Sequence, residues 1–154
     1  MKRTFAFILS LMMALSVLAV GLADEAAAGD EAEFVVPKVV PAKGMEDFTG
    51  EWFICRVVCE DGKVIGREEM IAEDNLPDSG VDITITEDRI LLFDMDEDDG
   101  DPIIKPEYVP EDGTLKLVNG RDEPPVLRMN DNGMLSCFVQ LSEKVQYTVY
   151  FARK

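Results

Sequence analysis

The chain has 154 residues, with 31 acidic against 15 basic side chains, a formal net charge of −16 and no histidine. The length and the 47% apolar content suit one globular domain with a core of its own. The acidity argues against nucleic acid and against an anionic membrane surface as partners, because both bind to basic patches. The absence of histidine excludes Ser-His-Asp and Cys-His nucleophiles and all histidine-ligated metal sites.

Residues 1–23 have the pattern of a secretory signal peptide. Two basic residues at positions 2 and 3 precede an apolar run over 4–22, and small residues ending at Ala23 stand before acidic Asp24. The alternative is a membrane anchor, since the run nears the roughly 20 residues that span a bilayer. The cleavable site favours the signal peptide, so we expect a secreted protein. Cleavage leaves 13 basic residues against 31 acidic, a net charge of −18.

Residues 24–44 combine alanine, glycine, acids and two prolines without a sustained period. This composition predicts a spacer, in which 34–36 or 39–40 could pair as an edge strand. We therefore expect the folded domain to occupy residues 45–154.

Short apolar runs separated by turn signals follow from Gly50 onward, and Asp-Gly and Asn-Gly pairs between the runs are typical of tight hairpins. One candidate for a helical turn lies at 72–76. Because open sheets leave exposed edges, we expect an antiparallel up-and-down β-barrel of about eight strands, with a β-sandwich as the alternative. The predicted strands are 51–59, 64–71, 81–86, 90–95, 103–109, 114–118, 126–129, 134–141 and 145–152.

The two ends of this domain carry a family resemblance. Gly50 and Trp52 form a Gly-x-Trp just ahead of the first long strand, and the last strand ends in Arg153 and Lys154. This pairing resembles the calycin superfamily, in particular the short lipocalin-like domains of secreted bacterial proteins. The resemblance implies that Trp52 plugs one end of the barrel and that Arg153 or Lys154 covers the indole ring, where a cation gains roughly 0.5–2 kcal/mol.

A barrel of this size either encloses a small apolar ligand or fills with its own side chains. We expect a non-enzymatic domain without a cofactor that binds a small hydrophobic molecule. The alternative is an extracellular module with a filled interior that contacts another protein. Alternation along the strands predicts these interior residues: Trp52, Ile54, Arg56, Val58, Ile83, Phe93, Tyr108, Leu117, Phe138, Tyr147, Val149 and Phe151.

The acidic stretch over 94–101 suggests a further alternative, an acidic Ca²⁺-binding module. Carboxylates at alternating positions resemble a calcium loop, although Asp99 stands where the glycine of such loops belongs. The simpler interpretation is a solvated hairpin tip. The ligands would be Asp94, Asp96, Asp98 and Asp101.

Three cysteines, Cys55, Cys59 and Cys137, allow at most one intramolecular disulfide. Cys55 and Cys59 lie on one strand, roughly 13 Å apart at about 3.3 Å per residue, which exceeds disulfide reach. A disulfide would therefore join Cys137 to one of them. The simpler alternative is that all three are small buried apolar residues.

Overall fold

The computed structural model of the chain describes residues 34–72, 82–92, 104–118, 123–142 and 145–154. The expected signal peptide, residues 24–33, Phe93 and the four aspartates of the acidic stretch lie outside these ranges. The elements are β1 (Val39–Val40), η1 (a 3-10 turn, Met45–Asp47), β2 (Gly50–Cys59), β3 (Val64–Gly66), α2 (Arg67–Ala72), β4 (Ile83–Ile85), β5 (Ile90–Leu92), β6 (Lys105–Val109), β7 (Thr114–Val118), β8 (Val126–Asn130), β9 (Leu135–Ser142) and β10 (Val145–Arg153).

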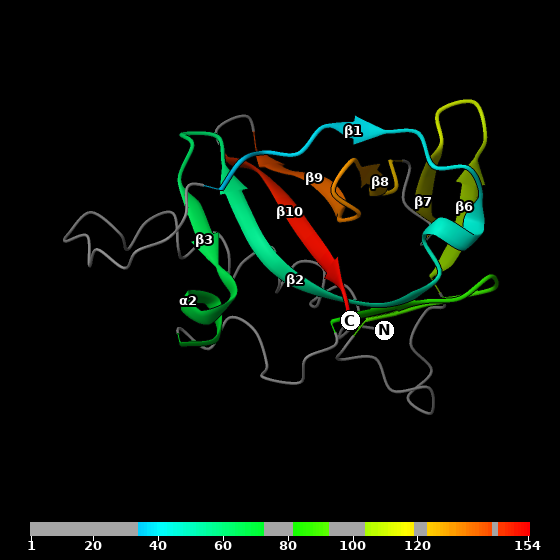
Figure 1. The fold of residues 1–154 in the computed structure, drawn as a ribbon, viewed down its shortest axis with the longest axis horizontal. Helices are drawn as coiled ribbons and strands as arrows, with labels where there is room; N and C mark the ends of the chain where they lie inside the picture. Colours follow the sequence, from blue (N-terminus) through cyan, green and yellow to red (C-terminus); the bar gives the residue numbers. More distant parts are fainter. Residues whose placement is uncertain (1–33, 73–81, 93–103, 119–122, 143–144) are drawn as a thin grey trace.

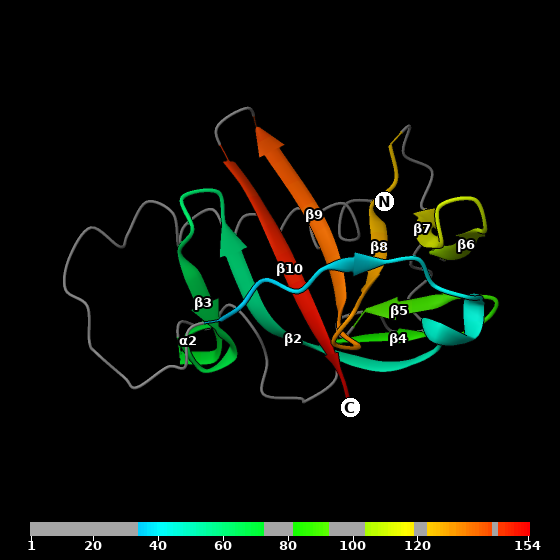
Figure 2. The same ribbon diagram turned by 45° about the horizontal axis from the view of Figure 1, so that its top comes forward.

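Eight strands follow one another around a barrel in the order β5-β4-β2-β10-β9-β8-β7-β6, and all neighbours pair antiparallel. The two ends of this order meet at one bridge, where the Ile90 N–H donates to the carbonyl of Ile104 at 2.9 Å. Figures 1 and 2 show the strands curving around a shared interior. The predicted antiparallel β-barrel is therefore confirmed, as one nearly closed sheet rather than two packed sheets.

The chain between β3 and β4 departs from the predicted strand over 64–71. β3 ends at Gly66, and α2 follows at once with a buried Met70. The segment is rich in good helix formers, and Glu68 and Glu69 stand in its first turn, where acids favour a helix. β3 and β4 then pair with the same edge of β2, at its two ends. The expected helical turn at 72–76 lies almost wholly outside the described residues.

Residues 34–44, which we call the strap, run across the outside of the barrel instead of forming a spacer (Figures 1 and 2). Within the strap, β1 pairs with β8, so the expected edge strand at 39–40 is present. The Ala42 N–H donates to the carbonyl of Gly113 at 3.0 Å. Gly113 has φ +62, and a Cβ there would lie 2.7 Å from the Cα of Pro41, so the strap requires glycine at this turn. The folded unit therefore includes the strap and does not begin at residue 45.

Candidate functional site

The inward side chains of the barrel cover one another almost completely. A space wide enough for a water molecule beside them would leave part of their surface exposed. Among the described side chains named next, the space is instead filled by the protein's own atoms, packed as protein cores are. The inward side chains that are at most 3% exposed are Trp52, Ile54, Val57, Ile83, Ile85, Ile90, Ile104, Leu115, Leu127, Leu135 and Val149.

Most of the predicted interior residues lie in this core or at its border. Tyr108 is half-buried at the border, where its hydroxyl donates to the carbonyl of Ala42 at 2.8 Å and its ring packs against Phe48. The predicted residues that belong to the core are Trp52, Ile54, Ile83, Leu117, Tyr147, Val149 and Phe151.

Three predicted interior residues face outward. The pairing of β10 with β2 slips between Tyr150 and Phe151, because Tyr150 pairs with Arg56 and Phe151 with Ile54. The extra residue, Cys55, forms a β-bulge, which reverses the alternation beyond it. Val57 consequently takes the buried position, and Arg56 and Val58 turn out of the barrel. The prediction for those two residues was therefore wrong.

Phe138 is the third outward residue, with 47% of its surface exposed. Its neighbours Leu135 and Cys137 belong to the core, and Val139 packs against it. Strict alternation along β9 therefore turns Phe138 to the outside. The predicted alternation had the wrong phase on this strand, so the prediction for Phe138 was wrong.

One end of the barrel is closed around Trp52. Its ring is fully buried, and its Nε1–H donates to the carbonyl of Phe48 at 2.8 Å. Arg153, its direct partner across β2 and β10, lies over the ring with Cζ 4.6 Å from the ring centroid. The guanidinium also donates to the carbonyl of Asp47 in η1 at 2.8 Å. Lys154 does not share this role, since its Nζ lies 3.7 Å from Glu51 Oε2.

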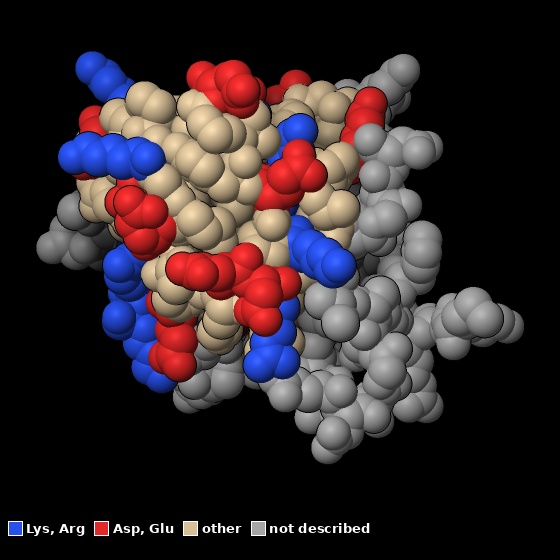
Figure 3. All heavy atoms as spheres, turned by 90° about the vertical axis from the view of Figure 1, so that its right-hand side faces the viewer, with Lys and Arg blue, Asp and Glu red and all other residues tan. Residues whose placement is uncertain are grey.

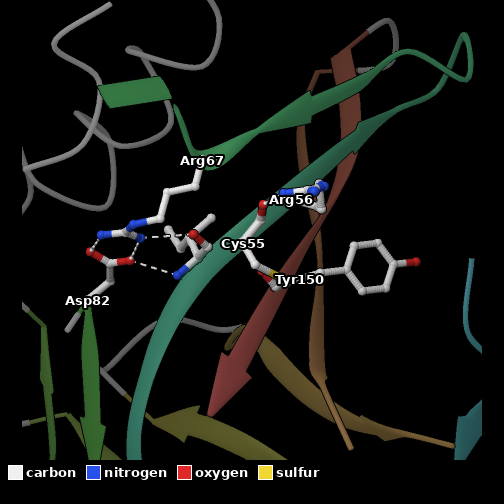
Figure 4. Close-up of polar contacts among 6 residues, drawn as sticks. Cys55, Arg56, Arg67, Asp82 and Tyr150 are labelled. Atoms are coloured by element: carbon white, nitrogen blue, oxygen red, sulfur yellow. Dashed lines mark hydrogen bonds and ion pairs between the residues drawn. The ribbon is translucent and has the colours of Figure 1, made fainter. Parts of the chain in front are cut away.

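A buried ion pair fills the gap between β3 and β4 along the edge of β2. The Ile54 N–H donates to Asp82 Oδ2 at 2.6 Å, and Arg67 Nη1 donates to the Ile54 carbonyl at 2.8 Å. Arg67 and Asp82 also contact each other at 2.5 Å (Figure 4). Two side chains thus satisfy the backbone groups that a continuous neighbouring strand would have paired. No motif in the sequence pointed to this pair.

The three cysteines are free thiols, so the possible disulfide between Cys137 and Cys55 or Cys59 is not formed. β10 lies between β2, which carries Cys55 and Cys59, and β9, which carries Cys137. Two strand spacings of about 4.8 Å already exceed the roughly 7 Å that a disulfide can bridge between Cα atoms.

The thiols are poor nucleophiles. Burial raises the pKa of Cys137 to about 11 and also raises the pKa values of Cys55 and Cys59. Thiols that keep their protons near neutral pH react slowly, which gives no support to a catalytic cysteine.

The outer face of β2, β10, β9 and β8 is assembled in rows by the strand register. One row places Arg56, Tyr150, Ser136 and Arg128 side by side. Phe34 of the strap packs edge-on against Tyr150, with ring centroids 5.3 Å apart. In Figure 4, Arg56 and Tyr150 lie on the side of β2 away from the Arg67–Asp82 pair.

The next row along this outer face is uncharged from β3 to β8. Val58 pairs with Val64 on β3 and with Thr148 on β10, and Thr148 pairs with Phe138 on β9. Leu127 pairs with Cys137, which puts Val126 of β8 beside Phe138. Beyond Val126 the register continues to Lys116 of β7 and Glu107 of β6, whose side chains form an ion pair. The part of these two rows between β3 and β8 is called the outer face below. The outer face holds two arginines and no acid.

Within the described ranges, no group of three Cys, Asp or Glu side chains gathers where it could hold a metal ion. No helix in that part of the chain is long and apolar enough to cross a membrane. Comparison with protein-family models, with curated proteins and with solved structures found no match.

Proposed function

We propose that the protein is a secreted, non-enzymatic binding domain of lipocalin-like architecture that contacts a protein partner through the outside of its barrel. The covered interior carries this proposal, because a lumen filled by Trp52, Leu115, Leu135 and their neighbours offers no room to an apolar ligand. Export rests on the pattern of residues 1–23, and the lipocalin-like architecture on Trp52 and Arg153 at the closed end.

The exposed apolar side chains support a partner on the outside. Val35, Val36, Val39 and Phe138 are each 47–80% exposed. The first three belong to the strap, and Phe138 belongs to the outer face. Three of the four stand within five consecutive positions of the strap, and apolar side chains grouped on a surface are typical of interaction surfaces, unlike single exposed ones. On the side where β6 and β7 lie, by contrast, acidic and basic side chains are mixed, as in the pair Lys116–Glu107 (Figure 3).

The first test asks whether the interior takes up a ligand. The folded protein is titrated with cis-parinaric acid and with 8-anilinonaphthalene-1-sulfonate, while the emission of Trp52, the only tryptophan, is recorded. We expect no saturable one-to-one binding and no change in emission. Saturable binding that shifts the emission of the buried Trp52 would contradict the proposal and favour a ligand carrier.

The second test asks where a partner binds. A photoreactive p-benzoylphenylalanine replaces Phe138 in cells that express and export the protein, with Glu107, exposed on β6, as the control position. We expect a protein adduct at Phe138 and none at Glu107. Adducts at neither position, or equally at both, would count against a partner on the outer face.

A further inference from the structure

We propose that the outer face recognises an extended segment of a partner protein that carries two carboxylates flanking an apolar side chain. This inference rests on the proposed function, since it names the chemistry of the partner that the domain would bind.

The charge of the outer face is opposite to that of the whole molecule. The full chain has about twice as many acids as bases, yet the only charged residues of the two rows between β3 and β8 are Arg56 and Arg128. The nearest acid along the second row, Glu107, is paired with Lys116. Neither arginine forms an ion pair with a carboxylate of the described residues. The one hydrogen bond of the Arg56 side chain goes from Nη1 to the carbonyl of Cys55, the residue before it. Within the described part of the chain, both guanidinium groups are therefore without a carboxylate partner and present an unpaired positive charge to an acid from outside.

The spacing of the two arginines sets the spacing of the carboxylates. Arg56 on β2 and Arg128 on β8 stand in one row with Tyr150 and Ser136 between them. Three strand spacings of about 4.8 Å put their Cα atoms roughly 14 Å apart. An extended segment rises about 3.4 Å per residue, so carboxylates four positions apart span that distance and point to the same side. A lipid with one carboxylate would reach only one of the two arginines.

The uncharged row supplies the apolar half of the site. Val64, Val58, Thr148, Phe138 and Val126 cross five strands beside the arginine row. Phe138 is 47% exposed, and the other four are half-buried. The centre of the arginine row is already covered by Phe34, so an apolar side chain of the partner, between its two carboxylates, would rest against Phe138.

The test uses three synthetic peptides and fluorescence anisotropy at low salt. The first is Ser-Glu-Thr-Phe-Thr-Glu-Ser, the second has lysine in place of both glutamates, and the third has its two glutamates only two positions apart. We expect the first peptide to bind saturably, and the other two at least tenfold more weakly. No saturable binding of the first peptide up to 1 mM, or equal binding of the lysine peptide, would overturn the inference.

Variants of the protein locate the site. Arg56→Glu and Arg128→Glu should each weaken binding of the first peptide at least tenfold, and Phe138→Ser should weaken it at least threefold. Lys105→Glu makes the same charge change at an exposed position of β6 and should leave binding within twofold. Arg56→Gln serves where Arg56→Glu fails to fold, as judged by its urea midpoint. Equal losses in the Arg56 and Lys105 variants would show only a net-charge effect and overturn the inference.

Two further outcomes separate this inference from the proposed function. If crosslinking at Phe138 captures a protein whose crosslinked segment lacks acids, the proposed function stands and the inference fails. If sedimentation shows that a second copy of the chain covers the outer face, with dimerisation lost in Phe138→Ser, the acidic segment is likewise excluded.

Discussion

Among single residues, Asp82 and Arg67 have the most demanding environment in the described structure. The Asp82 side chain is 1% exposed and that of Arg67 is 15% exposed. The carboxylate accepts from the Ile54 N–H and from the guanidinium, which also lies 5.4 Å from the Phe53 ring centroid. Removing one member of a buried pair leaves the other charge without compensation, which costs more than the pair contributes as a whole.

We therefore expect Asp82→Asn to lower the free energy of unfolding by about 3–5 kcal/mol. The double variant Asp82→Asn with Arg67→Met should lose less than Asp82→Asn alone, because it removes the uncompensated charge. Urea unfolding followed by Trp52 emission measures both. Glu107→Gln, which breaks an exposed ion pair, is the control and should cost less than about 1 kcal/mol. A loss for Asp82→Asn no larger than for this control would refute the role given to the pair.

Residue-level prediction from the sequence depended on local register. The contact at the barrel end was expected from the family resemblance, which left Arg153 and Lys154 as alternatives, and the register of β2 and β10 puts Arg153 over Trp52. Arg56 and Val58 were misplaced because one residue inserted at Cys55 inverts every later position. The Arg67–Asp82 pair joins positions 15 apart through a gap between strands, which no periodic pattern can indicate.

The strap shows how an element without regular periodicity can still belong to a fold. It is held by backbone pairing of β1 with β8, by the Lys38 N–H donating to Asp131 Oδ1 at 3.2 Å, and by the Tyr108 hydroxyl on Ala42. Its two prolines and the lack of a sustained apolar period led to its prediction as a spacer. Barrel strands were predictable because their hairpin turns are local, whereas the strap is attached through partners more than 60 positions away.

A chain that begins at residue 45 should be less stable than one that begins at residue 34. The shorter chain loses the hydrogen bonds to β8, Gly113 and Tyr108, each worth about 1 kcal/mol, and exposes the ring of Tyr150. We expect a loss of at least about 2 kcal/mol, read from urea midpoints at equal slope. Equal stability of the two chains would restore the boundary at residue 45 that the sequence suggested.

For the molecule as a whole, the buried thiols and phenols make stability depend on alkaline pH. Burial raises the pKa of Cys137 to about 11 from an ordinary 9.0, and burial also raises those of Tyr147 and Tyr150. Between pH 9 and about pH 11 the Cys137 thiol keeps its proton in the folded state and releases it in the unfolded state. Stability falls with rising pH wherever the folded state binds more protons. The contribution is therefore complete below pH 9 and is lost as the pH rises through about 11.

The Cys137→Ala variant should lose less stability than the parent protein between pH 9 and pH 11, although it starts from a lower value because of the cavity. Urea unfolding at pH 8, 9, 10 and 11 measures the two slopes. Cys59→Ala removes a thiol that is less buried than Cys137. Its free energy of unfolding should therefore fall with pH more nearly as that of the parent protein does. Identical declines in parent and Cys137→Ala would show that the thiol does not titrate as its burial requires.

The position of β10 in the barrel also decides when the chain can fold. β10 lies between β2 and β9 in the sheet. It brings Arg153 opposite Trp52, a residue 101 positions earlier in the chain. The hairpins β4–β5, β6–β7 and β8–β9 can form as they are synthesised, but the wall cannot close before β10 is available. Pairings between distant segments form late and slowly. Until β10 has been made, the edges of β2 and β9 that face it have no strand to pair with, so the barrel closes by a late step that joins segments distant in the sequence.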